Sequence, residues 1–209
     1  MAMNSFTRML CLGASITGLL GTPVQAQEAT NAAAAAVAKN LLLDADLLPP
    51  IPPQTAAWVF STWNLHDNSA GAVKVDGKII TNADGHHCLA ITASGPLHNN
   101  QMWWQNQNMA CTGGTTYELT ASVKGTQQGS GAARPTVGVY FLDASGKWLG
   151  FQEIAGNQAS SLPADWQQVQ GTVIAPSDAA KMGVRLGVIF TDCQAEAFYK
   201  DPVLIPKSN

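Results

Sequence analysis

The adjacent tryptophans Trp103 and Trp104, followed by Gln105, carry the most distinctive chemistry of this sequence. Flat aromatic faces stack against the C–H surfaces of sugar rings, and planar amides hydrogen-bond to pairs of hydroxyl groups. Adjacent side chains of a strand leave on opposite faces, so one tryptophan packs in the core and the other is available to a ligand. The sequence therefore offers the side chains that a site for a hydroxyl-rich ligand needs.

Tyr140 and Arg185 each lie between two apolar residues of a strand-like run. By alternation both point away from the core, toward whichever sheet surface carries the ligand. Tyr140 could equally pack beneath a loop, and Arg185 could simply pair with an acidic residue. Trp148 and Gln152 follow a turn at residues 143–146, where Trp148 could close one end of a groove, although singly exposed aromatic residues are ordinary.

Catalytic chemistry has weaker candidates. Glycoside hydrolysis needs two carboxylates about 5 to 10 Å apart across a cleft, and Glu118, Asp143 and Glu153 are the plausible donors. None of the three lies in a recognisable catalytic motif, and the sequence contains no nucleophile elbow or phosphate-binding loop. The neighbours His86 and His87 diverge on a strand and cannot chelate one zinc ion together.

Charged residues make up only 12% of the chain, against about 25% in an average soluble domain. Lys and Arg number 11 and Asp and Glu 14; without Arg8, which belongs to the N-terminal segment described next, the balance is 10 − 14 = −4. Such a balance argues against a protein that binds nucleic acid by neutralising phosphates. The polarity comes from Gln, Asn, Thr and Ser instead, which suits a neutral, hydroxyl-rich partner.

Residues 1–26 have the parts of an export signal: a short start ending at Arg8, an apolar stretch at 9–20 and small residues before a cut after Ala26. The apolar stretch is shorter than the roughly 20 residues that span a bilayer. We therefore expect a secreted or periplasmic protein without a membrane span. Residues 27–39 form an Ala-rich arm, disordered or weakly helical, residues 40–206 a single domain, and residues 207–209 a tail.

Cleavage of the signal leaves Cys88, Cys111 and Cys193. An odd number of cysteines in an oxidising compartment indicates one disulfide and one leftover thiol. Cys88 begins one predicted strand and Cys111 follows the end of the next, and an up-and-down path brings these positions to the same end of the fold. The favoured pair is Cys88 with Cys111, which requires Cα atoms within about 7 Å, and Cys193 is expected to stay free.

The segments that position these residues are short runs rich in Val, Ile, Thr, Tyr and Trp, each closed by Gly, Asn, Asp or Pro. Residues 116–124 alternate with a period of two, which indicates a strand with one buried face. Residues 125–135, rich in glycine, are expected to form a surface loop. With no convincing long amphipathic helix, the pattern predicts an all-β fold, a two-sheet β-sandwich or jelly roll.

Four motifs follow one another in the order residues 40–47 (NLLLDADL), 104–125 (WQNQNMACTGGTTYELTASVKG), 165–176 (DWQQV, then AP) and 199–203 (YKDPV). Their order and spacing resemble carbohydrate-binding modules of the family 4, 9 and 22 type, which have a galactose-binding-like jelly roll. The resemblance covers about residues 40–206. Leu47 stands where that group usually has an aromatic residue, and the proline-rich run after it is an unusual insertion.

The resemblance implies a concave sheet that holds a glycan. Counting back from Gly114 in strict alternation places Trp104 at a position that usually faces the cleft, and Trp103 in the core. A single β-bulge would exchange the two.

A structural Ca²⁺ is also implied, because the ends of the first and last strands of the resembled fold meet around this ion. Asp46 and Asp201 would supply carboxylate oxygens, with Asp44 in reserve. The alternative is that these are solvated acids at strand ends.

These observations predict an exported, non-catalytic carbohydrate-binding module that holds a neutral glycan by aromatic stacking and amide hydrogen bonds. A polysaccharide-degrading jelly-roll enzyme and a cell-surface adhesion or assembly module that binds protein are the alternatives. Exposure of Trp104 and Tyr140 would favour sugar binding, and burial of both would favour adhesion. The predicted ligand-binding residues are Trp104, Gln105, Tyr140, Trp148, Gln152 and Arg185.

Overall fold

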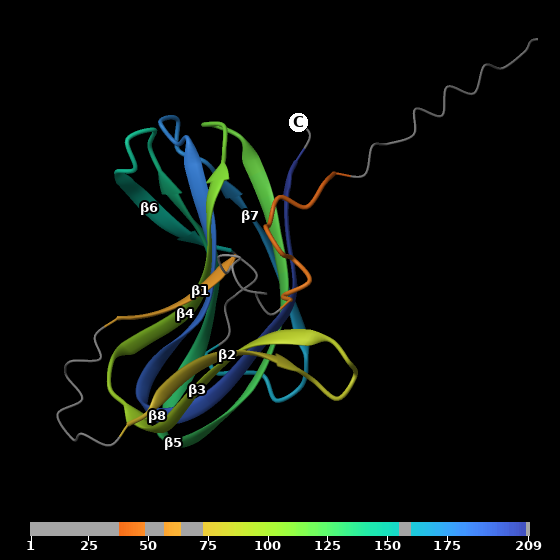
Figure 1. The fold of residues 1–209 in the computed structure, drawn as a ribbon. Helices are drawn as coiled ribbons and strands as arrows, with labels where there is room; N and C mark the ends of the chain where they lie inside the picture. Colours follow the sequence, from red (N-terminus) through yellow and green to blue (C-terminus); the bar gives the residue numbers. More distant parts are fainter. Residues whose placement is uncertain (1–37, 49–56, 64–72, 155–159, 208–209) are drawn as a thin grey trace, which may run out of the picture. The chain divides into compact units, whose positions relative to one another are not determined.

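The computed structural model describes residues 38–48, 57–63, 73–154 and 160–207, and within these ranges the chain forms eight β-strands and no helix (Figure 1). The predicted all-β fold is confirmed. The expected signal, nearly all of the Ala-rich arm and the end of the tail lie outside the described residues. The strands are β1 (Trp58–Trp63), β2 (Val75–Thr81), β3 (His87–Leu97), β4 (Asn100–Ala110), β5 (Thr116–Leu142), β6 (Trp148–Glu153), β7 (Gln167–Ile174) and β8 (Lys181–Pro206).

The long strands β5 and β8 pair antiparallel along nearly their whole lengths (Figure 1). Their register shifts between Gly129 and Ala132. Gly129 has a φ of 116° there, which a glycine adopts without strain, and Asp192 on the facing strand has a φ of 50°. The expected surface loop at residues 125–135 is therefore part of β5, and its glycines mark a change of direction within a strand.

All eight strands are hydrogen-bonded into one continuous sheet, and this irregularity divides it into two halves, which we call sheet I and sheet II. Sheet I contains, in order, β1, β4, the first half of β8, the second half of β5, and β6. Sheet II contains β2, β3, the second half of β8, the first half of β5, and β7. Because each long strand gives one half to each sheet, the two sheets close around one core as a jelly roll.

Large side chains from both sheets fill this core, among them Trp58, Phe141, Phe190 and Tyr199, each at most 2% exposed. Burial of such a side chain contributes about 1.5–3 kcal/mol. The Tyr199 hydroxyl in sheet II donates a hydrogen bond to the carbonyl of Gly187 in sheet I, and burial holds the pKa of this tyrosine far above its ordinary value. The inner faces of the sheets are thus occupied by the core, and their outer faces are left for function.

Residues 40–47, expected as the first strand, form bends and turns. Asp44 and Leu47 have φ values of 51° and 56°, which interrupt an extended strand. Asn40 instead attaches the segment to the end of β8: its side chain donates to the carbonyl of Pro202 and accepts from the amide of Leu204, both at 3.0 Å.

The cysteines Cys88, Cys111 and Cys193 are all free thiols, so the predicted Cys88–Cys111 disulfide is wrong for this structure. Cys88 lies on β3 in sheet II, whereas Cys111 directly follows β4 in sheet I. The prediction assumed a simple up-and-down path between consecutive strands. In the jelly roll these strands belong to different sheets.

Candidate functional site

Aromatic rings from three strands surround Arg185 on the outer face of sheet I. Arg185 lies on β8, and the rings of Trp103, Tyr140 and Trp148 come from β4, β5 and β6. The chain neighbours of Arg185, Trp103 and Tyr140 are core residues, so by alternation these three side chains face outward. We call Trp103, Tyr140, Trp148 and Arg185 the aromatic cluster.

Ring faces enclose the Arg185 guanidinium. Its central carbon lies 4.5 Å from the ring centroid of Trp103, 5.1 Å from that of Tyr140 and 5.0 Å from that of Trp148. Its Nε donates to Oε1 of Gln105 at 3.0 Å. Among the described residues no carboxylate lies within ion-pair distance of Arg185, so the structure does not support the alternative of a simple acid partner.

Desolvation dominates the electrostatics of the cluster. Burial lowers the pKa of Arg185 from its ordinary value, an effect that Tyr140 opposes. Burial raises the pKa of the Tyr140 hydroxyl, against the opposing influence of Arg185 and a hydrogen bond with Gln105. At neutral pH the pair is therefore a partly desolvated cation beside a neutral phenol.

Two glycines let the rings lie close to the sheet. Gly183 and Gly187 flank Arg185 on β8 at a spacing of two, so all three share the outer face. A Cβ at Gly183 would collide with the Tyr140 ring, and a Cβ at Gly187 would collide with the Cβ of Trp103 and the backbone of β4. The Gly-x-Arg-x-Gly sequence of β8 thus makes room for a ring on each side of the guanidinium.

The aromatic cluster and the neighbouring Phe151 leave ring surface exposed. Trp148 is 47% exposed and Phe151 on β6 is 37% exposed, while Trp103 is partly exposed. Beside them lies a pocket of about 270 Å³ lined by Gln101, Trp103, Thr136, Phe151, Glu153, Arg185 and Ile189. The site therefore combines flat apolar faces with amide, hydroxyl and guanidinium groups, which is a chemistry suited to sugar rings.

Trp104 lies in the core and not in the cluster. It is 6% exposed, packs against Phe60 with ring centroids 5.5 Å apart, and donates its indole N–H to the carbonyl of Ala90 in sheet II at 3.0 Å. The prediction of an exposed Trp104 and a core Trp103 is therefore wrong. The cause is a register shift within residues 106–109, which inverts the alternation counted back from the end of β4.

Gln152 also lies apart from the cluster. Its amide donates to the carbonyl of Ile174 at 2.7 Å and accepts from the amide of Ile174 at 3.1 Å, which joins β6 to β7. Both ends of the amide are used within the fold, so the position does not support the predicted ligand contact. The remaining predicted residues, Gln105, Tyr140, Trp148 and Arg185, do come together on one face.

Sequence reasoning missed Trp103 and Phe151. A usable signal existed for Trp103, because it lies two residues before Gln105 and must share its face of the strand. Phe151 lies opposite Tyr140 in the β5–β6 pairing, and this register becomes known only from the structure. Tyr140 itself is only 4% exposed, so it supports neighbouring rings and does not offer its own face.

The three candidate catalytic carboxylates lie in separate places. Glu153, which lines the pocket, is ion-paired with Arg134. Glu118 pairs with Lys207 at 3.2 Å in sheet II. Asp143 is in a turn, where hydrogen bonds from the Ser145 hydroxyl and from backbone amides lower its pKa.

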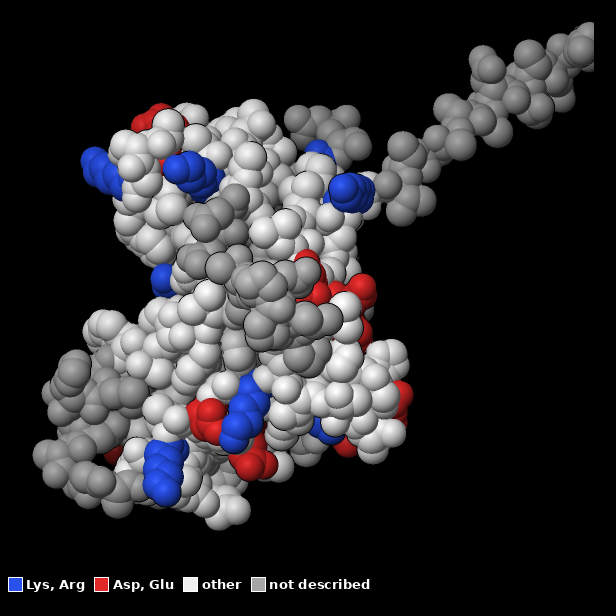
Figure 2. Space-filling model, in the orientation of Figure 1, with Lys and Arg blue, Asp and Glu red and all other residues white. Residues whose placement is uncertain are grey.

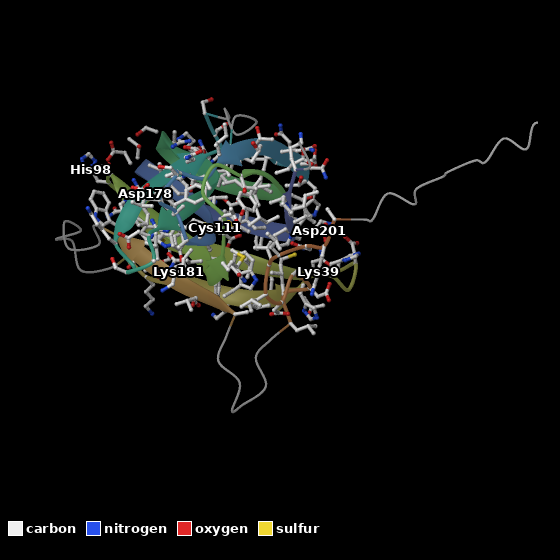
Figure 3. The ribbon with its side chains drawn as sticks, turned by 90° about the horizontal axis from the view of Figure 1, so that it is seen from above. Lys39, His98, Cys111, Asp178, Lys181 and Asp201 are labelled. Carbon is white, nitrogen blue, oxygen red and sulfur yellow. The ribbon has the colours of Figure 1, made fainter. Side chains whose placement is uncertain are left out.

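Asp46 and Asp201 line a second pocket, of about 390 Å³, together with Asn40, His86 and His87. Figure 3 shows Asp201 on the same side of the molecule as Lys39, consistent with the hydrogen bond from Asn40 to Pro202. Ca²⁺ prefers six to eight oxygen ligands. The two carboxylates fit part of such a set, although the described residues contain no cluster of three or more His, Cys, Asp or Glu that could hold a metal.

Charge is sparse on the face that Figure 2 shows. Lys and Arg, and Asp and Glu, form small patches there on a mostly uncharged surface. Within the described ranges, no helix has the length and apolarity to cross a membrane.

Comparison with known proteins shows which solved structures share this fold. No family model and no curated protein matches the sequence. A tandem of two family 22 carbohydrate-binding modules from Paenibacillus barcinonensis Xyn10C matches with a TM-score of 0.51 and 16% identity, over 82% of this chain and 46% of that one. The arabinose-bound α-L-arabinofuranosidase MgGH51 matches with a TM-score of 0.53 and 14% identity, over 81% of this chain and 27% of that one.

The enzymatically active domain of tailspike protein 4 from bacteriophage CBA120 matches with a TM-score of 0.50 and 11% identity, over 73% of this chain and 20% of that one. This chain thus spans less than half of each of these structures. At such identities the likeness establishes the fold alone. Together with the ordered motifs, it shows that this chain has the jelly-roll fold of the carbohydrate-binding modules that its sequence resembles.

Proposed function

We propose that this protein is an exported, non-catalytic carbohydrate-binding module that holds a poly- or oligosaccharide on the outer face of sheet I. The aromatic cluster carries the proposal. Exposed Trp148 and partly exposed Trp103 offer ring faces for stacking, and Gln105 and Arg185 place planar polar groups between them. Phe151 extends the stacking surface along β6. The signal-like residues 1–26 support export.

A binding role is favoured over hydrolysis by the placement of the carboxylates. Hydrolysis needs two of them about 5 to 10 Å apart across the cleft. Among the described residues that line the pocket, Glu153 is the one Asp or Glu, and its carboxylate is ion-paired with Arg134.

An adhesion module that binds protein is the second candidate, because Trp104 and Tyr140 are both buried, as that alternative expects. The sugar role is preferred because the exposed rings belong to other residues. Trp148 lies directly over Tyr140, and Trp103 takes the place assigned to Trp104.

In this proposal Asp46 and Asp201 hold a structural Ca²⁺ with backbone carbonyls. Their shared pocket beside Asn40 supports it. The ion would tie the N-terminal segment to the end of β8, where Asn40 already makes two hydrogen bonds.

The test is affinity electrophoresis and calorimetry of the exported protein with soluble β-glucans, xylans and mannans. Trp103→Ala should weaken binding by about tenfold or more, as expected for a central aromatic contact. Trp166→Ala is the matched control, because Trp166 lies against Lys124 and Lys200 of sheet II. Absence of binding to every neutral and acidic glycan, or full binding by Trp103→Ala, would contradict the proposal.

A further inference from the structure

The centre of the cluster has more hydrogen-bond donors than acceptors. A guanidinium has five N–H donors, and the structure gives Arg185 one acceptor within hydrogen-bond distance among the described residues, Oε1 of Gln105. Its other contacts are the ring faces of Trp103, Tyr140 and Trp148. The donors on its two terminal nitrogens are therefore available to a ligand.

Trp103 adds a second unused donor. Its indole Nε1 is buried and has no hydrogen-bond partner among the described residues, although the side chain as a whole is partly exposed. A buried donor without an acceptor is costly, and native structures usually supply a partner. Because the Trp103 ring lies directly against the Arg185 guanidinium, an acceptor that reaches one group lies close to the other.

The charge of the site also favours a ligand that accepts hydrogen bonds. Of the described residues that line the 270 Å³ pocket, Arg185 and Glu153 are the charged ones. Glu153 is ion-paired with Arg134, and no carboxylate of the described residues pairs with Arg185. A partly buried cation has lost hydration without gaining a counter-charge, so it benefits more from an anion than an exposed arginine would.

These three observations distinguish between ligands. A sugar hydroxyl both donates and accepts, whereas a carboxylate only accepts. A carboxylate is also planar and matches the guanidinium fork with two parallel hydrogen bonds. The low charge of the whole chain predicted a neutral glycan, but the Arg185 cation in this pocket has no acidic partner among the described residues.

We propose that Arg185 receives the carboxylate of an acidic sugar, so that the cluster selects a glycan that contains uronic acid residues. This inference rests on the proposed function of the same face. Trp148 and Phe151 then stack on the sugar rings of the glycan, and Arg185 binds the carboxylate.

The experiment compares matched polysaccharides that differ only in the carboxylate. Calorimetry of the exported protein would use polygalacturonate, alginate and glucuronoxylan, each beside its carboxyl-reduced form, in low and high NaCl. The acidic form of at least one should bind about tenfold or more tightly than its reduced form, because hydrogen bonds to charged groups are the stronger ones. The preference should shrink as salt rises.

Variants test whether Arg185 is the source of the preference for the acidic glycan. Arg185→Gln should abolish the preference, and Arg185→Lys should retain only part of it, because lysine keeps the charge but not the fork. Lys78→Gln is the control for net charge, since Lys78 is exposed on β2 of sheet II and pairs with Asp76. Thermal unfolding of each variant reports whether it folds, and the comparison on the unmodified protein does not depend on any variant.

Each outcome decides a different point. Equal binding of acidic and reduced glycans overturns the acidic preference and leaves the proposed function intact. Binding of sulfated dextran as tight as that of the uronate polymers overturns the choice of a carboxylate in favour of general anion attraction. No binding to any glycan overturns both proposals.

Discussion

Tyr140 and Trp148 stack nearly parallel, with ring centroids 5.5 Å apart and ring planes at 12°. Tyr140 is only 4% exposed, whereas Trp148 remains 47% exposed. Trp148 therefore keeps exposed ring surface although it rests on a tyrosine that is itself seated over Gly183. A ring supported in this way loses little freedom when a ligand stacks on it.

Replacement of Trp148 by alanine should weaken glycan binding by about tenfold, because it removes the most exposed ring of the cluster. The free energy of unfolding should change little, since the side chain is half exposed. Calorimetry and thermal unfolding check the two effects separately. Unchanged affinity would show that Trp148 is not part of the binding surface.

Replacement of Trp104 by alanine should have the opposite profile. The residue is in the core, so the variant should lose about 3–5 kcal/mol of unfolding free energy, as measured by urea denaturation. Glycan affinity of the molecules that remain folded should be nearly unchanged. A variant with normal stability and lost binding would restore the sequence-based assignment.

Replacement of Gly183 by alanine should displace the Tyr140 ring, because the added Cβ occupies its position. Overpacking of this kind costs about 1–3 kcal/mol and should also weaken binding through Trp148. Tyr140→Ala in the same chain removes the clash, so the stability effects of the two changes should be strongly non-additive. Additive effects would mean that the ring does not lie over this glycine.

Calcium should raise the unfolding temperature if Asp46 and Asp201 share the ion. Occupancy at 100 times the dissociation constant adds about 2.7 kcal/mol. Thermal unfolding in Ca²⁺ and in EGTA measures the shift, which Asp201→Asn should abolish and the exposed control Asp178→Asn should retain. Identical curves in both buffers for the unmodified protein would rule out a stabilising ion.

The three cysteines of the exported chain should all be alkylated after unfolding without reductant, with a mass increase for three thiols. In the folded state Cys111, which is half-buried, should react before Cys88 and Cys193. Burial raises the pKa of Cys111, so less thiolate is present at a given pH and its alkylation should be slower than that of a free thiol at pH 8. Recovery of only one alkylated cysteine would indicate a disulfide.

Local alternation was enough to predict the all-β class and the outward direction of Tyr140 and Arg185, because side chains of a strand alternate whatever the strand pairs with. It was not enough for Trp103 and Trp104. There the register shift within residues 106–109 exchanges the faces of the strand to which the two side chains point. No residue type in this segment predicts such a bulge.

The composition and motifs of the sequence by themselves determined a jelly roll with aromatic and amide side chains that the core does not need. Side-chain alternation, turn residues and ring chemistry are properties of short segments, so they can be recognised without the structure. Only the tertiary structure decided which of these side chains meet. Trp103 and Trp148 lie 45 positions apart in the chain and reach the same guanidinium because β8 pairs with β4 on one side and β5 on the other. That neighbourhood depends on register between distant strands, which is set by the packing of the whole core.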